Sequence, residues 1–328
     1  MDKLQPYLTK AQDFYRKFYE KRGKKGLVQA AALGLGLLFL QYQVRKHNGW
    51  LKKKSVANQH VFITGGASGI GRNMAFRFAK LGAKISIVDL NTTALQEVVD
   101  AINKESGDKT AFGVYCDVSD PQSVKNAISE SINFHKKNID ILINNAGVVS
   151  GKQLLQNSEA GVTKTININT TAHHWTVREV LGNMIENNHG HIVTIASIAG
   201  WVGVRGLVDY CASKFGAVGF DESLRFELRA KKSKVRTTCI CPYFINTGMF
   251  DGAKSKFPLL FPILSENYAS QRIVNAILQN ETVVIMPIIL NFAIIVKAIF
   301  PTCVYDNMME IFGVSESMDH FKGRAQSK

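Results

Sequence analysis

From His60 onward, short apolar runs alternate with longer stretches in which apolar residues recur at helical spacing. The runs have the length of buried strands and lie at residues 60–64, 84–89, 111–116, 140–144, 191–196, 235–240 and 282–286. Strands that alternate with helices are typical of a parallel sheet with helices on both faces. We therefore expect an α/β fold over residues 59–328, built as one domain on a doubly wound parallel sheet of about seven strands.

Residues 1–58 follow a different pattern. Apolar residues within 4–19 step by three and four, which predicts an amphipathic helix. The next segment, 26–44, has an uninterrupted apolar centre, and its 19 residues would reach about 28 Å as a helix, just enough for a bilayer core. Small residues at every fourth position suit close helix packing. We expect a membrane-anchor helix here, the alternative being a helix packed on another protein.

The net charge of +14 arises mainly from this N-terminal extension. Residues 1–58 carry 13 Lys or Arg against 3 acidic residues, whereas the other 270 residues carry 27 against 23. The body therefore lacks the basic stripe that a nucleic-acid footprint requires, which excludes nucleic acid as the main partner. The hydrophobic content of 46% and charged content of 20% also exclude a disordered chain.

Cysteines and histidines show no metal-binding pattern. The five cysteines include no C-x-x-C pair, so they predict neither a zinc site nor a disulfide framework. His173 and His174 are adjacent on an expected helix and point in different directions, and His189 and His191 have no carboxylate or cysteine nearby. We expect reduced, buried thiols and no metal.

A glycine-rich turn follows the first strand. It reads Gly65-Gly66-Ala67-Ser68-Gly69-Ile70-Gly71 and leads at once into a helix pattern. Glycines let the backbone approach a pyrophosphate, whose charge is met by free N–H groups and the helix dipole. Strand, turn and helix in this order predict a Rossmann-type dinucleotide site, with cofactor contacts at Gly65, Ser68, Gly69, Ile70 and Gly71.

The second strand ends in Asp89, about 20 residues after the glycines. A carboxylate at this place can accept both ribose hydroxyls and repel a 2′-phosphate, which favours NAD(H) over NADP(H). No Lys or Arg replaces Ser68, and Leu90 follows the acid. The alternative is that Asp89 caps the helix beginning near Thr92, and it could do both.

At this point the chain resembles the short-chain dehydrogenase/reductase family, over about residues 60–328. Thr64-Gly65-x-x-x-Gly69-x-Gly71 resembles its cofactor turn. The resemblance implies an adenine-side pair at Asp117 and Val118, and a sheet-bracing motif at Asn144-Asn145-Ala146-Gly147. It also implies cofactor contacts at Asn145, Ala146, Gly147, Tyr210, Lys214, Pro242, Ile245 and Thr247. The family usually has Pro-Gly where this chain has Pro242-Tyr243.

The resemblance further implies a catalytic set. Ser197, Tyr210 and Lys214 match its spacing, and alignment selects Asn169 over Asn167 as the fourth member. In the family roles Tyr210 exchanges the proton, Ser197 holds the substrate oxygen, and Asn169 holds a water that passes protons to Lys214. Residues four apart share a helix face. We therefore expect Lys214 and an oxidised nicotinamide to lower the pKa of Tyr210.

A narrower likeness, to the membrane-bound retinol and 17-beta-hydroxysteroid dehydrogenase branch, rests on residues 210–215, 247–250 and 312–314 with Met318-Asp319. In this family the insert at 244–264 covers the substrate, and here it is apolar. An apolar lid favours a lipophilic alcohol such as a retinoid, a steroid or a long-chain lipid. The alternative is a lid packed against a partner subunit.

Residues 288–300 are nearly all apolar, but 13 residues make only about 20 Å of helix, too short to span a bilayer. We expect this part of the C-terminal segment 288–313 to lie in the membrane interface or against a neighbour. A homodimer or a membrane-complex partner could bind through the N-terminal helix.

These patterns predict a membrane-anchored, NAD(H)-dependent oxidoreductase acting on a lipophilic alcohol or its carbonyl. The alternative is a structural subunit of a membrane complex that retains a nucleotide-binding fold. The resemblance suggests the endoplasmic reticulum or lipid droplets. A mitochondrial membrane is the alternative, although Asp2, Asp13 and Glu20 are unlike an acid-poor transit peptide.

Overall fold

The computed structural model describes residues 52–323. The predicted amphipathic helix and the predicted anchor at 26–44 lie outside this range, as do residues 324–328. Among the described residues, none of the helices combines the length and the apolar character needed to cross a bilayer.

The described residues form a seven-stranded sheet in the order β3-β2-β1-β4-β5-β6-β7, and every neighbouring pair is parallel. The strands are β1 (His60–Thr64), β2 (Lys84–Asp89), β3 (Ala111–Tyr115), β4 (Ile141–Asn144), β5 (His191–Ile195), β6 (Arg236–Pro242) and β7 (Val283–Met286). The predicted strands are confirmed to within two residues at each end. The order reverses between β1 and β4, and ligands bind at such a switch point, beyond the carboxyl ends of the strands.

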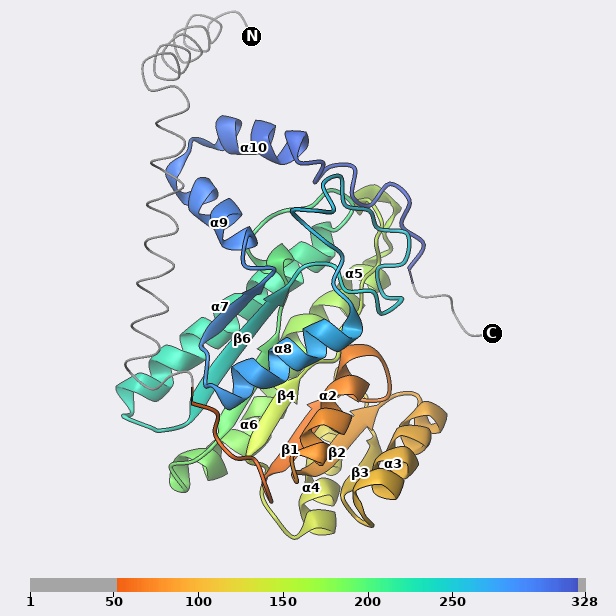
Figure 1. Cartoon of the computed structure of the whole chain (residues 1–328), viewed down its shortest axis with the longest axis vertical. Coiled ribbons are helices and arrows are strands. Elements are labelled where there is room, and N and C mark those ends of the chain that lie inside the picture. Colours follow the sequence, from red (N-terminus) through yellow and green to blue (C-terminus); the bar gives the residue numbers. More distant parts are fainter. Residues whose placement is uncertain (1–51, 324–328) are drawn as a thin grey trace, which may run out of the picture. The chain divides into compact units, whose positions relative to one another are not determined.

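Helices cover both faces of the sheet (Figure 1). One face carries α2 (Gly69–Lys80), α3 (Thr92–Ser106) and α8 (Glu266–Leu278). The other carries α4 (Pro121–His135), α6 (Ala172–Glu186) and α7 (Val208–Ala230). The remaining helical segments are η1 (Leu154–Gln156), α5 (Glu159–Ile166), η2 (Asn167–Thr171), η3 (Ile198–Gly200), α9 (Leu290–Ile299) and α10 (Thr302–Ile311).

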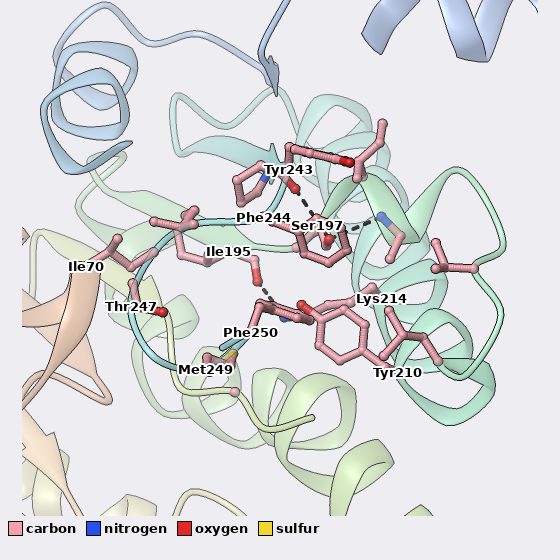
Figure 2. Close-up of a pocket in the computed structure, with 18 of the residues that line it drawn as sticks. Ile70, Ile195, Ser197, Tyr210, Lys214, Tyr243, Phe244, Thr247, Met249 and Phe250 are labelled. Atoms are coloured by element: carbon pink, nitrogen blue, oxygen red, sulfur yellow. Dashed lines mark hydrogen bonds between the residues drawn. The ribbon is translucent and has the colours of Figure 1, made fainter. Parts of the chain in front are cut away.

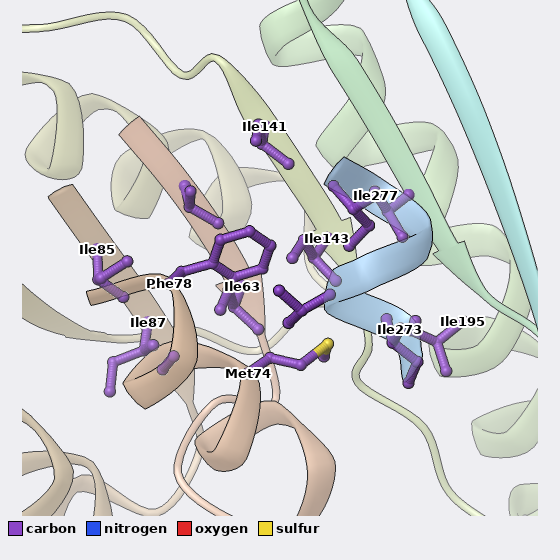
Figure 3. Close-up of a cluster of buried hydrophobic side chains, with 14 of the residues drawn as sticks. Ile63, Met74, Phe78, Ile85, Ile87, Ile141, Ile143, Ile195, Ile273 and Ile277 are labelled. Carbon is purple, nitrogen blue, oxygen red and sulfur yellow. The ribbon is translucent and has the colours of Figure 1, made fainter. Parts of the chain in front are cut away.

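The larger core cluster lies between the sheet and α2, α3 and α8. Figure 3 shows its centre, where Met74 and Phe78 of α2 meet Ile63 of β1 and Ile273 of α8. Successive residues of a strand point to opposite faces, so Phe62 belongs to the second cluster, under α4 and α6. Burial on both faces explains why the strands read as continuous apolar runs.

Phe78 is completely buried. The substitution Phe78→Ala should lower the free energy of unfolding by about 3–5 kcal/mol, because it removes buried apolar contacts and leaves a cavity. Urea unfolding followed by circular dichroism measures this loss. The matched control is Phe226→Ala, since this ring is 57% exposed, and an equal loss in both variants would contradict the assigned core.

Candidate active site

A cavity of about 400 Å³ opens at the carboxyl ends of the strands. It extends from the glycine turn between β1 and α2, past the ends of β4 and β5, to the lid, α9 and α10. All of the predicted site residues except Asn169 line this cavity. These are Gly65, Ser68, Gly69, Ile70, Gly71, Asp89, Asp117, Val118, Asn145, Ala146, Gly147, Ser197, Tyr210, Lys214, Pro242, Ile245 and Thr247.

The glycine turn is packed too tightly for side chains. Gly65 and Gly69 have φ of +64° and +55°, in the left-handed region that glycine tolerates best. A Cβ on Gly71 would lie 2.3 Å from the Gly65 carbonyl oxygen. The turn therefore presents bare backbone to the cavity at the start of α2, which fits a dinucleotide pyrophosphate.

Asn145, just after β4, holds this turn in place. Its side-chain amide donates to the carbonyl oxygens of Thr64 and Gly65, at 2.9 and 3.0 Å. Its backbone N–H donates to the Thr64 hydroxyl at 2.9 Å. These bonds tie the end of β4 to the end of β1, which is the bracing role that the resemblance implied.

Asp89 lies at the end of β2 and lines the cavity. One oxygen accepts a hydrogen bond from the Ala67 N–H of the glycine turn, and the other accepts one from the Asn91 N–H, each at 3.1 Å. The helix cap of α3 is instead Asn91, whose side chain accepts from the Ala94 N–H. The alternative reading of Asp89 as that cap is therefore wrong. A carboxylate has about four acceptor positions, so Asp89 can still receive ribose hydroxyls.

Asp117 and Val118 follow β3 on the same side of the cavity. The Asp117 carboxylate accepts hydrogen bonds from the backbone N–H and the hydroxyl of Ser119, at 2.9 and 2.7 Å. These bonds fix the loop, and Val118 contributes a buried apolar wall. A planar aromatic ring such as adenine can pack against this wall.

Figure 2 shows how separate elements bring Ser197, Tyr210 and Lys214 to the cavity. Ser197 follows β5, and the other two lie one turn apart on α7. The Lys214 ammonium donates to the Ile195 carbonyl oxygen at 2.9 Å and lies 5.7 Å from the centre of the Tyr210 ring. All three residues are buried.

Asn169 lies just behind this group. Its carboxamide exchanges hydrogen bonds of 2.9 Å with the backbone N–H and carbonyl of Val148 and donates to the Ser213 hydroxyl at 3.0 Å. A Cβ built on Gly147 would lie 3.3 Å from the Asn169 side-chain oxygen and 3.7 Å from the Lys214 ammonium. Asn169 and Lys214 therefore flank the same point, as the alignment implied.

Asn169 reaches this place through a π-helical turn, η2, between α5 and α6. Thr170, next in the turn, donates its hydroxyl hydrogen bond to the Ser213 carbonyl oxygen of α7 at 2.6 Å. Single π-helical turns inside helices often occur at functional sites. No sequence pattern predicted this turn.

Burial dominates the electrostatics of the catalytic group. It lowers the pKa of Lys214 to about 8 and raises the pKa of Tyr210 well above its usual value. A hydrogen bond with the Ser197 hydroxyl opposes the rise without cancelling it. Without a bound cofactor the phenol is therefore neutral and can act as a proton donor. The expectation that Lys214 and an oxidised nicotinamide together lower this pKa concerns the cofactor-bound enzyme and stays a prediction.

A second polar cluster adjoins Tyr210 and was not predicted. The buried carboxylate of Asp209 accepts hydrogen bonds from the Ser150 hydroxyl at 2.8 Å and from the Asn157 amide at 3.0 Å. These bonds fix the loop after β4 to the first turn of α7. The sequence shows only an acidic residue at the start of a helix, and its partners lie more than 50 positions away.

The C-terminal segment also differs from its predicted place. Leu290 and Val296 of α9 and Tyr305 of α10 are buried and line the cavity. The expectation that residues 288–300 lie in the membrane interface or against a neighbour is therefore incomplete. One side of this segment forms the roof of the cavity.

The turn geometry makes Gly71 a sharp test of the dinucleotide site. Gly71→Ala should weaken NADH binding at least tenfold, because the new methyl group would collide with the Gly65 carbonyl. Fluorescence titration measures the dissociation constant. Gly182→Ala is the matched control, since a Cβ there meets nothing within 4 Å, and unchanged affinity in both variants would contradict the site.

The buried Lys214 should leave a signature in the pH dependence of stability. Its pKa falls from 10.5 to about 8 in the folded state, so the unfolded chain binds more protons between these values. The free energy of unfolding should therefore rise from pH 8 to 10.5, with a contribution of about 3 kcal/mol from this residue.

Urea unfolding across this pH range, compared with Lys214→Met, measures that contribution. The variant should lose this part of the slope, and the exposed control Lys231→Met should keep it. Parallel slopes for wild type and Lys214→Met would show that Lys214 does not titrate as the structure indicates.

The family model described as short chain dehydrogenase matches residues 59–257. Short-chain dehydrogenase/reductase family 16C member 6 of Bos taurus is 44% identical over 277 residues, covering 84% of this chain and 87% of that protein. Epidermal retinol dehydrogenase 2 of Mus musculus is 39% identical over 293 residues, covering 89% and 94%. Retinol dehydrogenase 10 of Rattus norvegicus is 35% identical over 301 residues, covering 83% and 88%.

Among solved structures, a short-chain dehydrogenase/reductase from Burkholderia phymatum in complex with NAD has a TM-score of 0.67 at 23% identity. The match covers 75% of this chain and 94% of that one and supports the fold. The chain belongs to the short-chain dehydrogenase family, which confirms the predicted enzyme class, an oxidoreductase that uses NAD(H).

Proposed function

We propose that the protein is a membrane-bound enzyme that interconverts a lipophilic alcohol and its carbonyl by hydride transfer. One observation carries this proposal. The cavity that contains Ser197, Tyr210 and Lys214 joins the glycine turn and Asp89 on one side to an apolar chamber on the other.

The apolar chamber supports the substrate class. Its walls come from the lid and from the last two helices, through Phe244, Phe250, Phe261, Leu290, Phe292, Val296, Met308, Met309 and Phe312. An apolar pocket with a few convergent polar groups at one end suits a hydrophobic molecule bearing a single oxygen. Two similar proteins are named retinol dehydrogenases, which makes a retinoid the first candidate. A steroid or a long-chain lipid alcohol is also compatible with these walls.

Tyr243, which departs from the usual family pattern, contributes to this chamber. Its N–H donates to the Met286 carbonyl oxygen at 2.7 Å, so the strand pairing of β6 and β7 continues past Pro242. Its ring packs at 4.7 Å from Phe244 and 6.4 Å from Phe261, centre to centre. The change from glycine therefore adds an aromatic wall to the substrate side.

The chemistry assigns each polar group a role. NAD(H), when bound, supplies the hydride acceptor or donor. The neutral Tyr210 phenol donates its proton to a carbonyl oxygen in reduction and takes the proton back in oxidation. The Ser197 hydroxyl orients that oxygen, and the ring of Phe250, 5.5 Å from the Tyr210 ring, helps to exclude water. Lys214, held at the Ile195 carbonyl, lies behind the phenol and stabilises its negative charge as it forms.

The carboxylate of Asp89 supports the preference for NAD(H). Its two backbone hydrogen bonds fix it beside the glycine turn, where a 2′-phosphate would meet a negative charge. The following residue, Leu90, supplies no compensating cation.

We assign the protein to the membrane of the endoplasmic reticulum or of lipid droplets, with the predicted anchor at 26–44 outside the described residues.

The substitution Tyr210→Phe tests the mechanism. Turnover should fall about 10²–10⁴-fold because the proton donor is lost, while the NADH dissociation constant should stay within about twofold. The full chain in detergent is assayed with NAD⁺ and NADP⁺ against retinol, a steroid alcohol and a long-chain alcohol. Tyr115→Phe is the matched control, since this ring is 55% exposed at the end of β3. Near-normal turnover by Tyr210→Phe would contradict the proposal.

A further inference from the structure

We propose that the lid and α9 form a lipid-docking face through which the substrate reaches the cavity from the lipid phase. This inference rests on the proposed function and adds the surface and the access route. The docking face is defined by the exposed apolar residues Leu259, Leu260, Ile263, Ile288, Phe292, Ile295 and Ile299.

Helix α9 is apolar on both of its sides. Leu290 and Val296 face inward and are buried. Phe292, Ile295 and Ile299 follow one another along α9 at steps of three and four, so they form a single stripe, and they are 58%, 52% and 70% exposed. Ile288, in the turn before the helix, is 66% exposed. A surface helix of a soluble protein normally exposes polar residues to solvent, whereas the outward side of α9 exposes isoleucine and phenylalanine.

The charge on α9 does not interrupt this stripe. Lys297 is two residues from Ile295, which places it about 200° around the helix, on the opposite side. Its ammonium donates to the Trp201 carbonyl oxygen at 2.8 Å and lies 5.0 Å from the centre of the Phe215 ring. The stripe therefore keeps a continuous apolar surface, and Lys297 fastens α9 to the segment after Ser197.

The lid repeats this two-sided pattern. Phe261 points inward, lines the cavity and packs 5.7 Å from the Phe312 ring, centre to centre. Its neighbours Leu259 and Leu260 are 98% and 49% exposed, in a tip bounded by Pro258 and Pro262. The same inward packing joins the lid to α9, because Phe261 belongs to the cluster around Leu290 and Val296.

The docking face reaches the rim of the cavity. Phe292 both lines the cavity and is more than half exposed, and Ile289 lines it with 43% of its surface exposed. A molecule dissolved among acyl chains can therefore pass from the face into the chamber along apolar side chains. Retinoids and steroids partition strongly into lipid, so this route avoids the cost of moving them through water.

The occupant to which we commit is a lipid surface. At about 1.5 Å per residue, the ten residues of α9 cover only about 15 Å, which suits a helix lying in the interface plane. A nearly fully exposed leucine at the tip of a lid suits insertion among acyl chains, whereas protein interfaces carry direct hydrogen bonds between the partners. The sequence also contains a second apolar segment of 19 residues, at 26–44.

Fluorescent labels at single positions test the docking face directly. Cys303, the exposed cysteine of the described chain, is replaced by serine. Leu259→Cys, Ile299→Cys and the control Phe226→Cys are then labelled with an environment-sensitive dye in the full chain and reconstituted into phosphatidylcholine vesicles. The control side chain is 57% exposed on α7.

Labels at 259 and 299 should be quenched at least threefold more by acyl-chain spin-labelled lipid than the label at 226, and less by aqueous iodide. Iodide quenching equal to that at 226 would overturn the proposal. Protection from both quenchers would also overturn it, because a protein, such as a second copy of this chain, would then cover the face.

Kinetics test the access route. Leu259→Glu with Ile299→Glu should raise the KM for vesicle-dissolved retinol at least tenfold while leaving turnover in detergent unchanged, and Phe226→Glu should change neither. An unchanged vesicle KM would overturn the route. Lipid quenching at 259 and 299 in a protein that oxidises none of the tested alcohols would uphold the docking face and refute the proposed function.

Discussion

The hydrogen bonds from Asn145 to the end of β1 are the constraint on which the site depends. They join the two strands between which the sheet reverses its order, so they fix the glycine turn relative to the elements that carry the catalytic group. These partly buried hydrogen bonds are specific, because a displaced turn would leave its carbonyl groups without partners. Gly65 can accept such close packing only because it lacks a side chain.

The catalytic group is built at a cost to stability. Lys214 is buried and loses hydration, and its hydrogen bond to the Ile195 carbonyl does not restore its ordinary pKa. Tyr210 stays neutral for the same reason. The surrounding bonds of Asp209 and Asn169 hold the neighbouring backbone rigid. The site therefore combines poorly solvated reactive groups with a hydrogen-bonded frame, which is the arrangement that electrostatic preorganisation requires.

Much of the fold and the cofactor side could be predicted from sequence, because buried parallel strands and the glycine turn produce local patterns. The resemblance supplied Asn169, but nothing local indicated the π-helical turn that places it. The bonds of Asp209 depend on residues distant in sequence. The spacing of Tyr210 and Lys214 reveals the neighbouring charge but not the depth of burial, which raises the pKa of the phenol. A run that is apolar at nearly every position, such as α9, has too little periodicity to show which side faces inward.

The cofactor side and the substrate side of the cavity are lined largely by different segments of the chain, and this separation affects how substrate specificity can change. Most of the cofactor side of the cavity comes from the ends of β1, β2, β3 and β4, all within the first half of the described fold, whereas part of the roof over the substrate comes from α9 and α10, beyond residues 59–257 that the family model matches. Changes in α9 and α10 can therefore alter the shape of the substrate chamber while the residues on the cofactor side stay the same. The last two helices therefore form a part of the site that can vary separately from the residues that bind the cofactor.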